Sequence, residues 1–183
     1  MNKTIIGLAG RKQSGKTSAA MHLEKSGFVR LSFAYPMRRM LSILLYDFGY
    51  SQDDIELMLT KGKEVPLLPF EQSPRHLLQT LGTEWGRNCI HPDLWVLVAK
   101  QKILSAEADY IVLDDVRFEN EAAMIRELGG LIIHIDRGGL MTDSHASEHG
   151  IDDHEADAFV DNDHSLTDFL LDVHAFVAGH IGR

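Results

Sequence analysis

The sequence predicts an α/β fold in which helices cover both faces of a parallel β-sheet. Strand and helix patterns alternate along the chain, which is the order that produces parallel strands joined by helical crossovers. The first strand pattern, at 4–10, is continuously apolar, as in strands that are buried on both faces. A glycine-rich loop at 10–17 then joins this strand to a helix.

Each element has its own pattern. After the first strand, the remaining four are expected at 28–33, 110–116, 131–136 and 158–162. Helices are expected at 17–27, 36–48, 51–62, 73–87, 92–104, 119–130 and 165–180. Ser51 and Ser73 suit helix N-caps and Gly27 suits a helix end, whereas the prolines within 63–72 indicate a loop.

The chain of 183 residues is expected to form one domain with an insertion and a lid. Four helical patterns in succession separate the second strand from the third, so we place a helical insertion at 36–107. The alternating core then comprises 1–35 and 108–183. A polar stretch follows the fourth strand, and we expect it to form a short lid over about 137–156.

The composition argues against several classes of protein. A net charge of −9 argues against binding to a nucleic-acid polymer, which needs a basic surface, but allows a local positive pocket. No apolar run approaches the roughly 18 residues of a membrane helix, so we expect no membrane partner. Cys89 is the sole cysteine, which fits a reducing compartment and a small buried side chain. We expect a cytoplasmic protein.

Residues 10–17 read GRKQSGKT and match the pattern G-x-x-x-x-G-K-[ST]. Glycines let the backbone curl so that successive N–H groups point at phosphate oxygens. The dipole of the following helix adds to this, and Lys16 reaches the β and γ phosphates. The motif predicts a nucleoside triphosphate site with Lys16 as a catalytic residue. We expect the nucleoside triphosphate to be bound by Gly10, Gln13, Ser14, Gly15, Lys16, Thr17 and Ser18.

The loop also refines the fold class and implies a metal. We expect a three-layer α/β/α P-loop NTPase fold with a five-stranded parallel sheet, a helical acceptor-binding insertion and a short lid. Such enzymes hold Mg²⁺ through a hydroxyl after the loop lysine and a carboxylate at the end of another strand. Thr17 supplies the hydroxyl, and Asp114 and Asp115 end the third strand. Neighbouring strand residues point to opposite faces, so the sequence leaves open which aspartate faces the loop.

Arginines recur beyond the loop, several of them directly after a predicted strand. They are Arg38, Arg39, Arg75, Arg87, Arg117 and Arg137. Phosphoryl transfer between two anionic substrates needs cations to bring the substrates together and to offset charge in the transition state. A phosphate acceptor needs no general base, and no acid stands just after the second strand, in LSFAYPMRR. The pattern therefore favours a kinase whose acceptor is itself a phosphate.

Three alternatives stay open at this point. One keeps the core and changes the acceptor to dephospho-coenzyme A, shikimate or another small alcohol, which would need a carboxylate base. Another is a nucleotide-dependent switch or ATPase that acts on a protein partner and would not need the arginines. The third is a metal site in the polar tract that contains His145, His149 and His154.

Five segments together resemble the phage-type deoxynucleoside monophosphate kinases, over residues 4 to about 170. The segments are GLAGRKQSGKT, SFAYPMR, RHLLQTLGTEWGRNCIHPDLW, LDDVRFENEA and HASEHGI. The resemblance implies transfer of the ATP γ-phosphate to a deoxynucleoside monophosphate, with Mg²⁺ as the cofactor. It also implies an adenylate-kinase-like core and a homodimer. The base that the enzyme prefers is not readable from these segments.

The resemblance also assigns residues. Arg117 resembles the arginine that clamps the acceptor phosphate, and Arg137 resembles that of the lid; both would be catalytic. Trp95 either stacks on the acceptor base or packs in the interior. Thr17 departs from several family members, which carry Asp after the loop lysine. The acceptor-binding residues that the resemblance implies are Lys12, Arg38, Arg75, Gln79, Thr83, Glu84, Arg87, Trp95, Arg117, His145, Ser147 and Glu148.

Overall fold

The computed structural model describes residues 3–68, 71–139 and 156–181. The chain divides into two compact units, of which the first comprises 1–33 with 98–183 and the second comprises 34–97. The second unit overlaps the helical insertion expected at 36–107. Within the described residues, no helix is long and apolar enough to cross a membrane.

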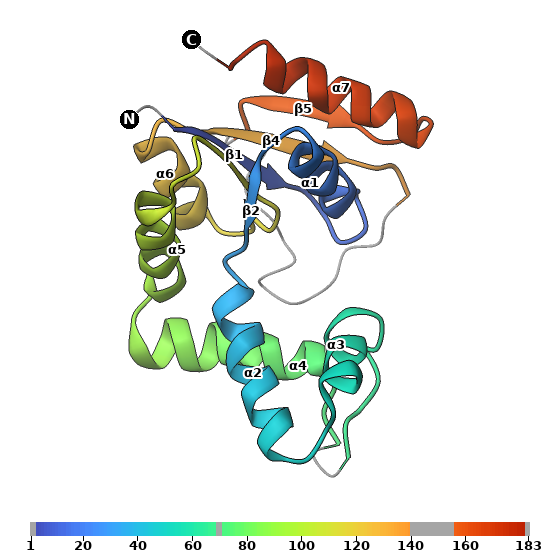
Figure 1. Cartoon of the computed structure of the whole chain (residues 1–183), viewed down its shortest axis with the longest axis vertical. Helices are drawn as coiled ribbons and strands as arrows, with labels where there is room; N and C mark the ends of the chain where they lie inside the picture. The colour runs from blue at the N-terminus through green and yellow to red at the C-terminus, as the bar shows by residue number, and fades with distance from the viewer. Residues whose placement is uncertain (1–2, 69–70, 140–155, 182–183) are drawn as a thin grey trace. The chain divides into compact units, whose positions relative to one another are not determined.

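The first unit is built on one sheet of five parallel strands, as the sequence predicts (Figure 1). The strand order is β2-β3-β1-β4-β5, so the first strand lies at the centre. β1 pairs with β3 from Thr4 opposite Tyr110, and with β4 from Ile6 opposite Leu131. The strands are β1 (Thr4–Ala9), β2 (Val29–Leu31), β3 (Tyr110–Leu113), β4 (Leu131–Asp136) and β5 (Ala158–Asp161).

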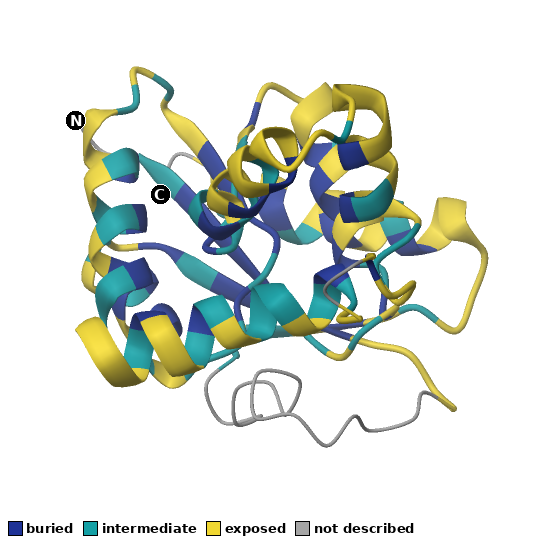
Figure 2. Ribbon diagram, turned by 90° about the horizontal axis from the view of Figure 1, so that it is seen from below, coloured by how far each residue is buried: buried dark blue, intermediate teal, exposed yellow. Residues whose placement is uncertain are grey.

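Helices cover both faces of this sheet and make three layers. On one face, α1 (Lys16–Lys25) and α7 (Leu166–Ala178) contribute Leu23 and Phe169 to the main core. On the other face, α6 (Glu119–Glu127) lies so close to the sheet that a Cβ on Gly7 would stand 2.7 Å from Ile125 Cδ1. α5 (Leu94–Ser105) lies beside α6, where Lys100 pairs with Glu127 at 2.6 Å. Figure 2 shows the resulting pattern, with buried strands and helices that are buried on their inner sides.

The second unit is helical. Its elements are α2 (Tyr35–Asp47), α3 (Gln52–Thr60), α4 (Pro74–Thr80), the π-helix η1 (Leu81–Ile90) and the start of α5. The Ser51 and Ser73 hydroxyls accept hydrogen bonds from Asp54 N and His76 N, each at 3.2 Å, so both predicted N-caps are confirmed. A separate apolar cluster holds the unit together: Leu41, Leu45, Ile55, Leu59 and Leu67.

The helix predicted at 73–87 changes its winding at Leu81, where η1 begins. Gly82 and Gly86 lie in this π-helical stretch and allow close approach of their neighbours. A Cβ on Gly82 would stand 2.9 Å from Met37 Sδ, and one on Gly86 would stand 2.6 Å from the Trp95 ring. Cys89, on the same helix, is exposed, so the expectation of a buried cysteine is wrong.

Candidate active site

The phosphate loop joins the end of β1 to the start of α1, and its backbone adopts the strained turns that its glycines allow. Gly10 and Gly15 have φ values of 127° and 116°, which favour glycine, and Gln13 also has a positive φ of 66°. A Cβ on Gly10 would stand 2.2 Å from the carbonyl oxygen of Ile135 on the neighbouring strand. Any side chain at this position would therefore displace the loop from the sheet.

Lys16 is the first residue of α1, and only 8% of it is exposed. Its Nζ donates hydrogen bonds to the carbonyl oxygens of Gly10 and Arg11, both at 2.6 Å. The ammonium therefore lies across the loop, where the motif requires it. Thr17 and Ser18 follow on the exposed first turn of the helix, and Ser14 is fully buried within the loop.

Asn162, which the sequence did not single out, supports the loop from behind. Its Nδ2 donates to the Ser14 carbonyl at 2.7 Å, and its backbone N–H donates to the Asp136 carbonyl at 2.9 Å. A Cβ on Gly15 would stand 2.5 Å from Asn162 Nδ2, so the amide is in close contact with the loop. The signal that was available is its position after the last strand, because parallel strands end at one edge of a sheet.

The two aspartates after β3 have different partners. Asp114, only 9% exposed, accepts a 2.8 Å hydrogen bond from Arg30 Nε, and Arg30 Nη2 also pairs with it. Asp115 accepts from the Ser32 hydroxyl at 2.7 Å through one oxygen and from Phe33 N at 2.9 Å through the other. Asp115 therefore fixes the segment that follows β2.

Strand alternation places Asp114 on the face of the sheet that α1 covers. Val112, two residues earlier on β3, packs in the core cluster with Leu23 of α1. Residues two apart in a strand point to the same face. Since the phosphate loop leads directly into α1, Asp114 is better placed than Asp115 to face the loop. Its oxygens are of the kind that Mg²⁺ prefers.

Arg117 and Arg137 follow the ends of β3 and β4. The backbone at Arg117 is fixed by Glu121, a residue that is 2% exposed, whose Oε2 accepts from Arg117 N at 2.8 Å and from Phe118 N at 3.2 Å. Arg137 is exposed, and its N–H donates to Asp136 Oδ1 at 2.9 Å. Both therefore start from the carboxyl edge of the sheet, as does Lys12 in the loop.

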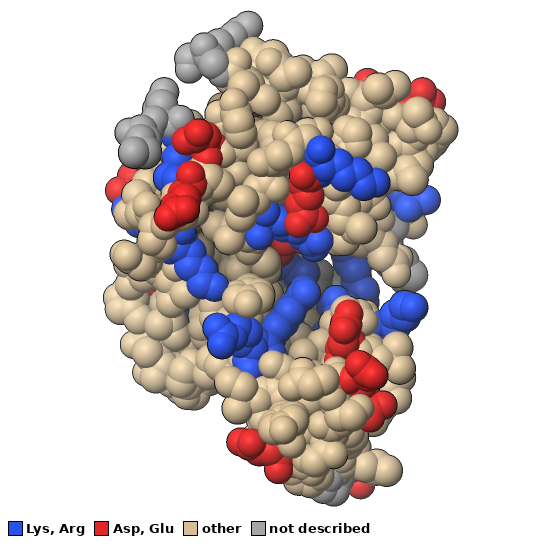
Figure 3. Space-filling view, in the orientation of Figure 1, with Lys and Arg blue, Asp and Glu red and all other residues tan. Residues whose placement is uncertain are grey.

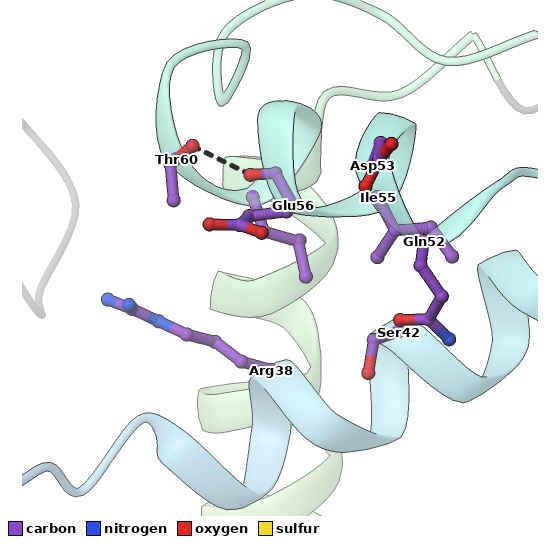
Figure 4. Close-up of a pocket in the computed structure, with 8 residues that line it drawn as sticks. Arg38, Ser42, Gln52, Asp53, Ile55, Glu56 and Thr60 are labelled. Carbon is purple, nitrogen blue, oxygen red and sulfur yellow. Dashed lines mark hydrogen bonds between the residues drawn. The ribbon is translucent and has the colours of Figure 1, made fainter.

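Within the second unit, Arg38 lies at a cavity of about 280 Å³ between α2 and α3. Its Nε is buried and has no hydrogen-bond partner among the described residues. Figure 4 shows Arg38 and Ser42 on α2 facing the α3 side chains, including Gln52 and Glu56. The sequence pointed to Arg38 and to none of its neighbours in the cavity, which are Ser42, Gln52, Asp53, Ile55, Glu56, Leu59 and Thr60.

The other acceptor candidates of this unit lie on α4 and η1. Arg75, Gln79 and Thr83 are spaced by four residues, which places them along one side of the helix. Arg75 Nε donates to Glu64 Oε1 at 2.6 Å, and Arg87 Nη1 donates to the Pro92 carbonyl at 3.1 Å. Glu84 is exposed.

Trp95 packs in the interior of the second unit, which is one of the two roles that the sequence left open for it. It is 3% exposed, its ring packs against Gly86, and its Nε1 donates to the Gly82 carbonyl at 2.8 Å. With its ring covered in this way, Trp95 is a packing residue of the second unit, and the expectation that it stacks on a base is wrong. Trp85, at 41% exposure, is the more accessible of the two indoles.

The remaining predicted residues, His145, Ser147 and Glu148, lie outside the described residues, as do His149 and His154. Across 3–68, 71–139 and 156–181, no group of three or more His, Cys, Asp or Glu side chains is arranged to hold a metal ion.

Comparison with known proteins identifies the family. Residues 67–173 match the family model of deoxynucleotide monophosphate kinase. A protein of Acanthamoeba polyphaga mimivirus named as a deoxynucleotide monophosphate kinase is 36% identical over 161 residues, which cover 79% of this chain and 80% of that protein. The deoxynucleoside-5'-monophosphate kinase of Escherichia phage T5 is 36% identical over 84 residues, which cover 46% of this chain and 32% of the phage protein.

A solved structure supports the same fold. The dephospho-CoA kinase of Campylobacter jejuni superposes with a TM-score of 0.53 and 17% sequence identity, over 96% of both chains. At this level of identity the likeness concerns the fold, which is that of a P-loop kinase. With a phosphate loop after the central strand and a relative matched over most of its length, the chain belongs to the deoxynucleotide monophosphate kinase family.

Proposed function

We propose that this chain transfers the γ-phosphate of ATP to the phosphate of a deoxynucleoside monophosphate, giving the diphosphate and ADP. The observation that carries the proposal is the phosphate loop, with Lys16 bonded across it, in a member of this family. The acceptor phosphate is already a nucleophile at neutral pH, so the reaction needs positioned cations rather than a general base.

The donor end of the site uses the loop and a divalent metal. Lys16 would contact the β and γ phosphates, and the backbone N–H groups of the loop would bind oxygens of the α and β phosphates. The donor set fits Mg²⁺, because Thr17, an exposed residue, offers a hydroxyl and Asp114, which also pairs with Arg30, offers a carboxylate on the α1 face. When bound, the ion would offset charge on the phosphate oxygens. Asp115 is assigned a structural role, since both of its oxygens hold the segment after β2.

The acceptor end uses cationic side chains. Arg117, whose backbone is fixed by Glu121, would bind the acceptor phosphate, and Arg137 would bind the transferring group. Arg38 is proposed as a further acceptor residue, because its buried Nε is the kind of donor that an anion satisfies. The complete proposed acceptor set is Lys12, Arg38, Arg75, Gln79, Thr83, Glu84, Arg87, Arg117, His145, Ser147 and Glu148.

A coupled assay of ADP release tests the function. The full chain is supplied with ATP, Mg²⁺ and each common deoxynucleoside or nucleoside monophosphate in turn, with an acceptor-free control. Turnover that requires particular monophosphates supports the proposal and gives the base preference. Turnover without any acceptor would mean an ATPase, and turnover with dephospho-coenzyme A alone would mean another kinase. Light scattering on the same sample tests the proposed homodimer.

A further inference from the structure

We propose that the turn Asp161–Asn162–Asp163, at the end of β5, is a clamp that positions two parts of the active site at once. One side chain of this turn holds the phosphate loop, and another holds the segment after β4 that carries Arg137. The sequence pattern predicts no role for this turn. The proposal rests on the proposed function only for the part that concerns Arg137.

The first arm of the clamp is Asn162. Its Nδ2 donates to the carbonyl of Ser14 at 2.7 Å, across 148 residues of sequence. This carbonyl belongs to the residue before Gly15, at the point where the loop turns into α1. Because a Cβ on Gly15 would stand 2.5 Å from the same nitrogen, the amide leaves little freedom for the loop to shift toward β5. Asn162 thus fixes the direction in which the next N–H groups point.

The second arm is Asp163. Its Oδ1 accepts from Gly138 N at 2.8 Å, and a Cβ on Gly138 would stand 2.8 Å from its Oδ2. Gly138 directly follows Arg137, whose own N–H is held by Asp136. Two successive N–H groups after β4 are therefore fixed by carboxylates, and one of these comes from the clamp.

The turn itself is braced, so the two arms share one frame. Asp161 Oδ1 accepts from Asp163 N at 2.8 Å, and Asn162 N donates to the Asp136 carbonyl at 2.9 Å. Because hydrogen bonds fix the backbone of the turn, its side chains can hold a site within the small positional tolerance that phosphoryl transfer requires. We infer that the clamp sets the position of Arg137 relative to the loop.

The test of the first arm is Asn162→Asp, an isosteric change that turns a donor into an acceptor facing a carbonyl. We expect a rise of at least about fivefold in the dissociation constant for mant-ATP, a fluorescent analogue of ATP. It is measured by fluorescence in the absence of any acceptor. Asn162→Ala should give a smaller rise in the same direction. A fall in the melting temperature with unchanged mant-ATP affinity would overturn this arm. The mant-ATP titration gives this answer even if the chain transfers no phosphate.

For the second arm, substitution should change kcat and not the affinity for mant-ATP. Asp163→Ala should lower kcat with a deoxynucleoside monophosphate by roughly threefold to tenfold and leave the affinity for mant-ATP unchanged. Asp163→Asn keeps an accepting oxygen and should restore most of kcat. Asp172→Ala, which removes an exposed carboxylate on α7, is the matched control and should match the unmodified chain.

A double mutant separates positioning from general destabilisation. If Asp163 acts through Arg137, then Asp163→Ala should have no further effect on kcat in an Arg137→Ala background. Additive losses of kcat would show that Asp163 does not act through Arg137. An Arg137→Ala variant with full kcat would show that Arg137 does not contribute to turnover, which would overturn the second arm. Absence of turnover in the unmodified chain would contradict the proposed function and the second arm together, while the mant-ATP measurement still decides the first.

Discussion

Lys16 is held by its own loop, and this position defines its expected role. Its Nζ bonds to the Gly10 and Arg11 carbonyls at 2.6 Å, so the ammonium lies where phosphate oxygens would be bound. We expect Lys16→Ala to lower kcat by about 10²-fold to 10³-fold, the usual effect of removing one transition-state contact. The coupled assay measures this, with the exposed Lys25→Ala on the same helix as control. Retained turnover would contradict the assignment of the loop.

The two aspartates after β3 should respond differently to substitution. Asp114→Asn should raise the Mg²⁺ concentration needed for half-maximal turnover by about tenfold or more, because a charged oxygen donor is lost. Asp115→Ala should instead lower the free energy of unfolding by about 1–3 kcal/mol, because Ser32 and Phe33 lose their acceptors. Urea unfolding should show a loss for Asp114→Asn too, because Asp114 is buried and paired with Arg30. Mg²⁺ titration of both variants therefore separates the roles, and a raised Mg²⁺ requirement in Asp115→Ala but not in Asp114→Asn would exchange them.

Arg117 should act on the acceptor rather than on ATP. We expect Arg117→Ala to raise the acceptor KM or to lower kcat, with a combined loss of about 10²-fold in kcat/KM, while mant-ATP affinity stays near that of the unmodified chain. Steady-state kinetics with a varied acceptor, combined with the fluorescence titration, separates the two. If mant-ATP affinity fell instead, Arg117 would belong to the donor side.

At the scale of the elements, the π-helix depends on its glycines. A Cβ on Gly86 would stand 2.6 Å from the ring of Trp95, which is itself bonded to the Gly82 carbonyl. Gly86→Ala should therefore lower the free energy of unfolding by about 1–3 kcal/mol through overpacking. Gly179→Ala is the control, since its Cβ would meet atoms no closer than 3.5 Å. Equal stability of the two variants would mean that the indole moves aside at little cost.

The elements also show what a sequence can predict. The strands, the parallel sheet and the capped helices follow from patterns within a few neighbouring residues, and the structure confirms them. The π-helix and the burial of Trp95 depend on contacts between Gly82, Gly86 and a residue on the next helix, which local periodicity does not register. Asn162 was missed for the same reason, because its partner Ser14 is 148 residues away.

At the scale of the whole molecule, the chain is acidic but carries basic side chains at its surface. The chain carries a net charge of −9, yet basic side chains reach the surface on the face shown in Figure 3. A nucleotide can therefore bind without a basic chain overall.

Nucleotide binding should raise the stability of the chain. Mg²⁺ with a non-hydrolysable ATP analogue, at a hundred times its dissociation constant, should add about 2.7 kcal/mol to the free energy of unfolding. Differential scanning fluorimetry measures the corresponding rise in melting temperature. Lys16→Ala should show a much smaller rise at the same concentration. An equal rise in both would place the nucleotide elsewhere.

Cys89 gives the molecule a practical property. It is the sole cysteine of the chain, and it is exposed on η1 in the second unit. A maleimide dye should therefore attach once per chain, with no cysteine to remove beforehand. Because the dye would be carried by η1, its signal would report on the helical unit. The sequence thus already contains a single site for attaching a spectroscopic probe.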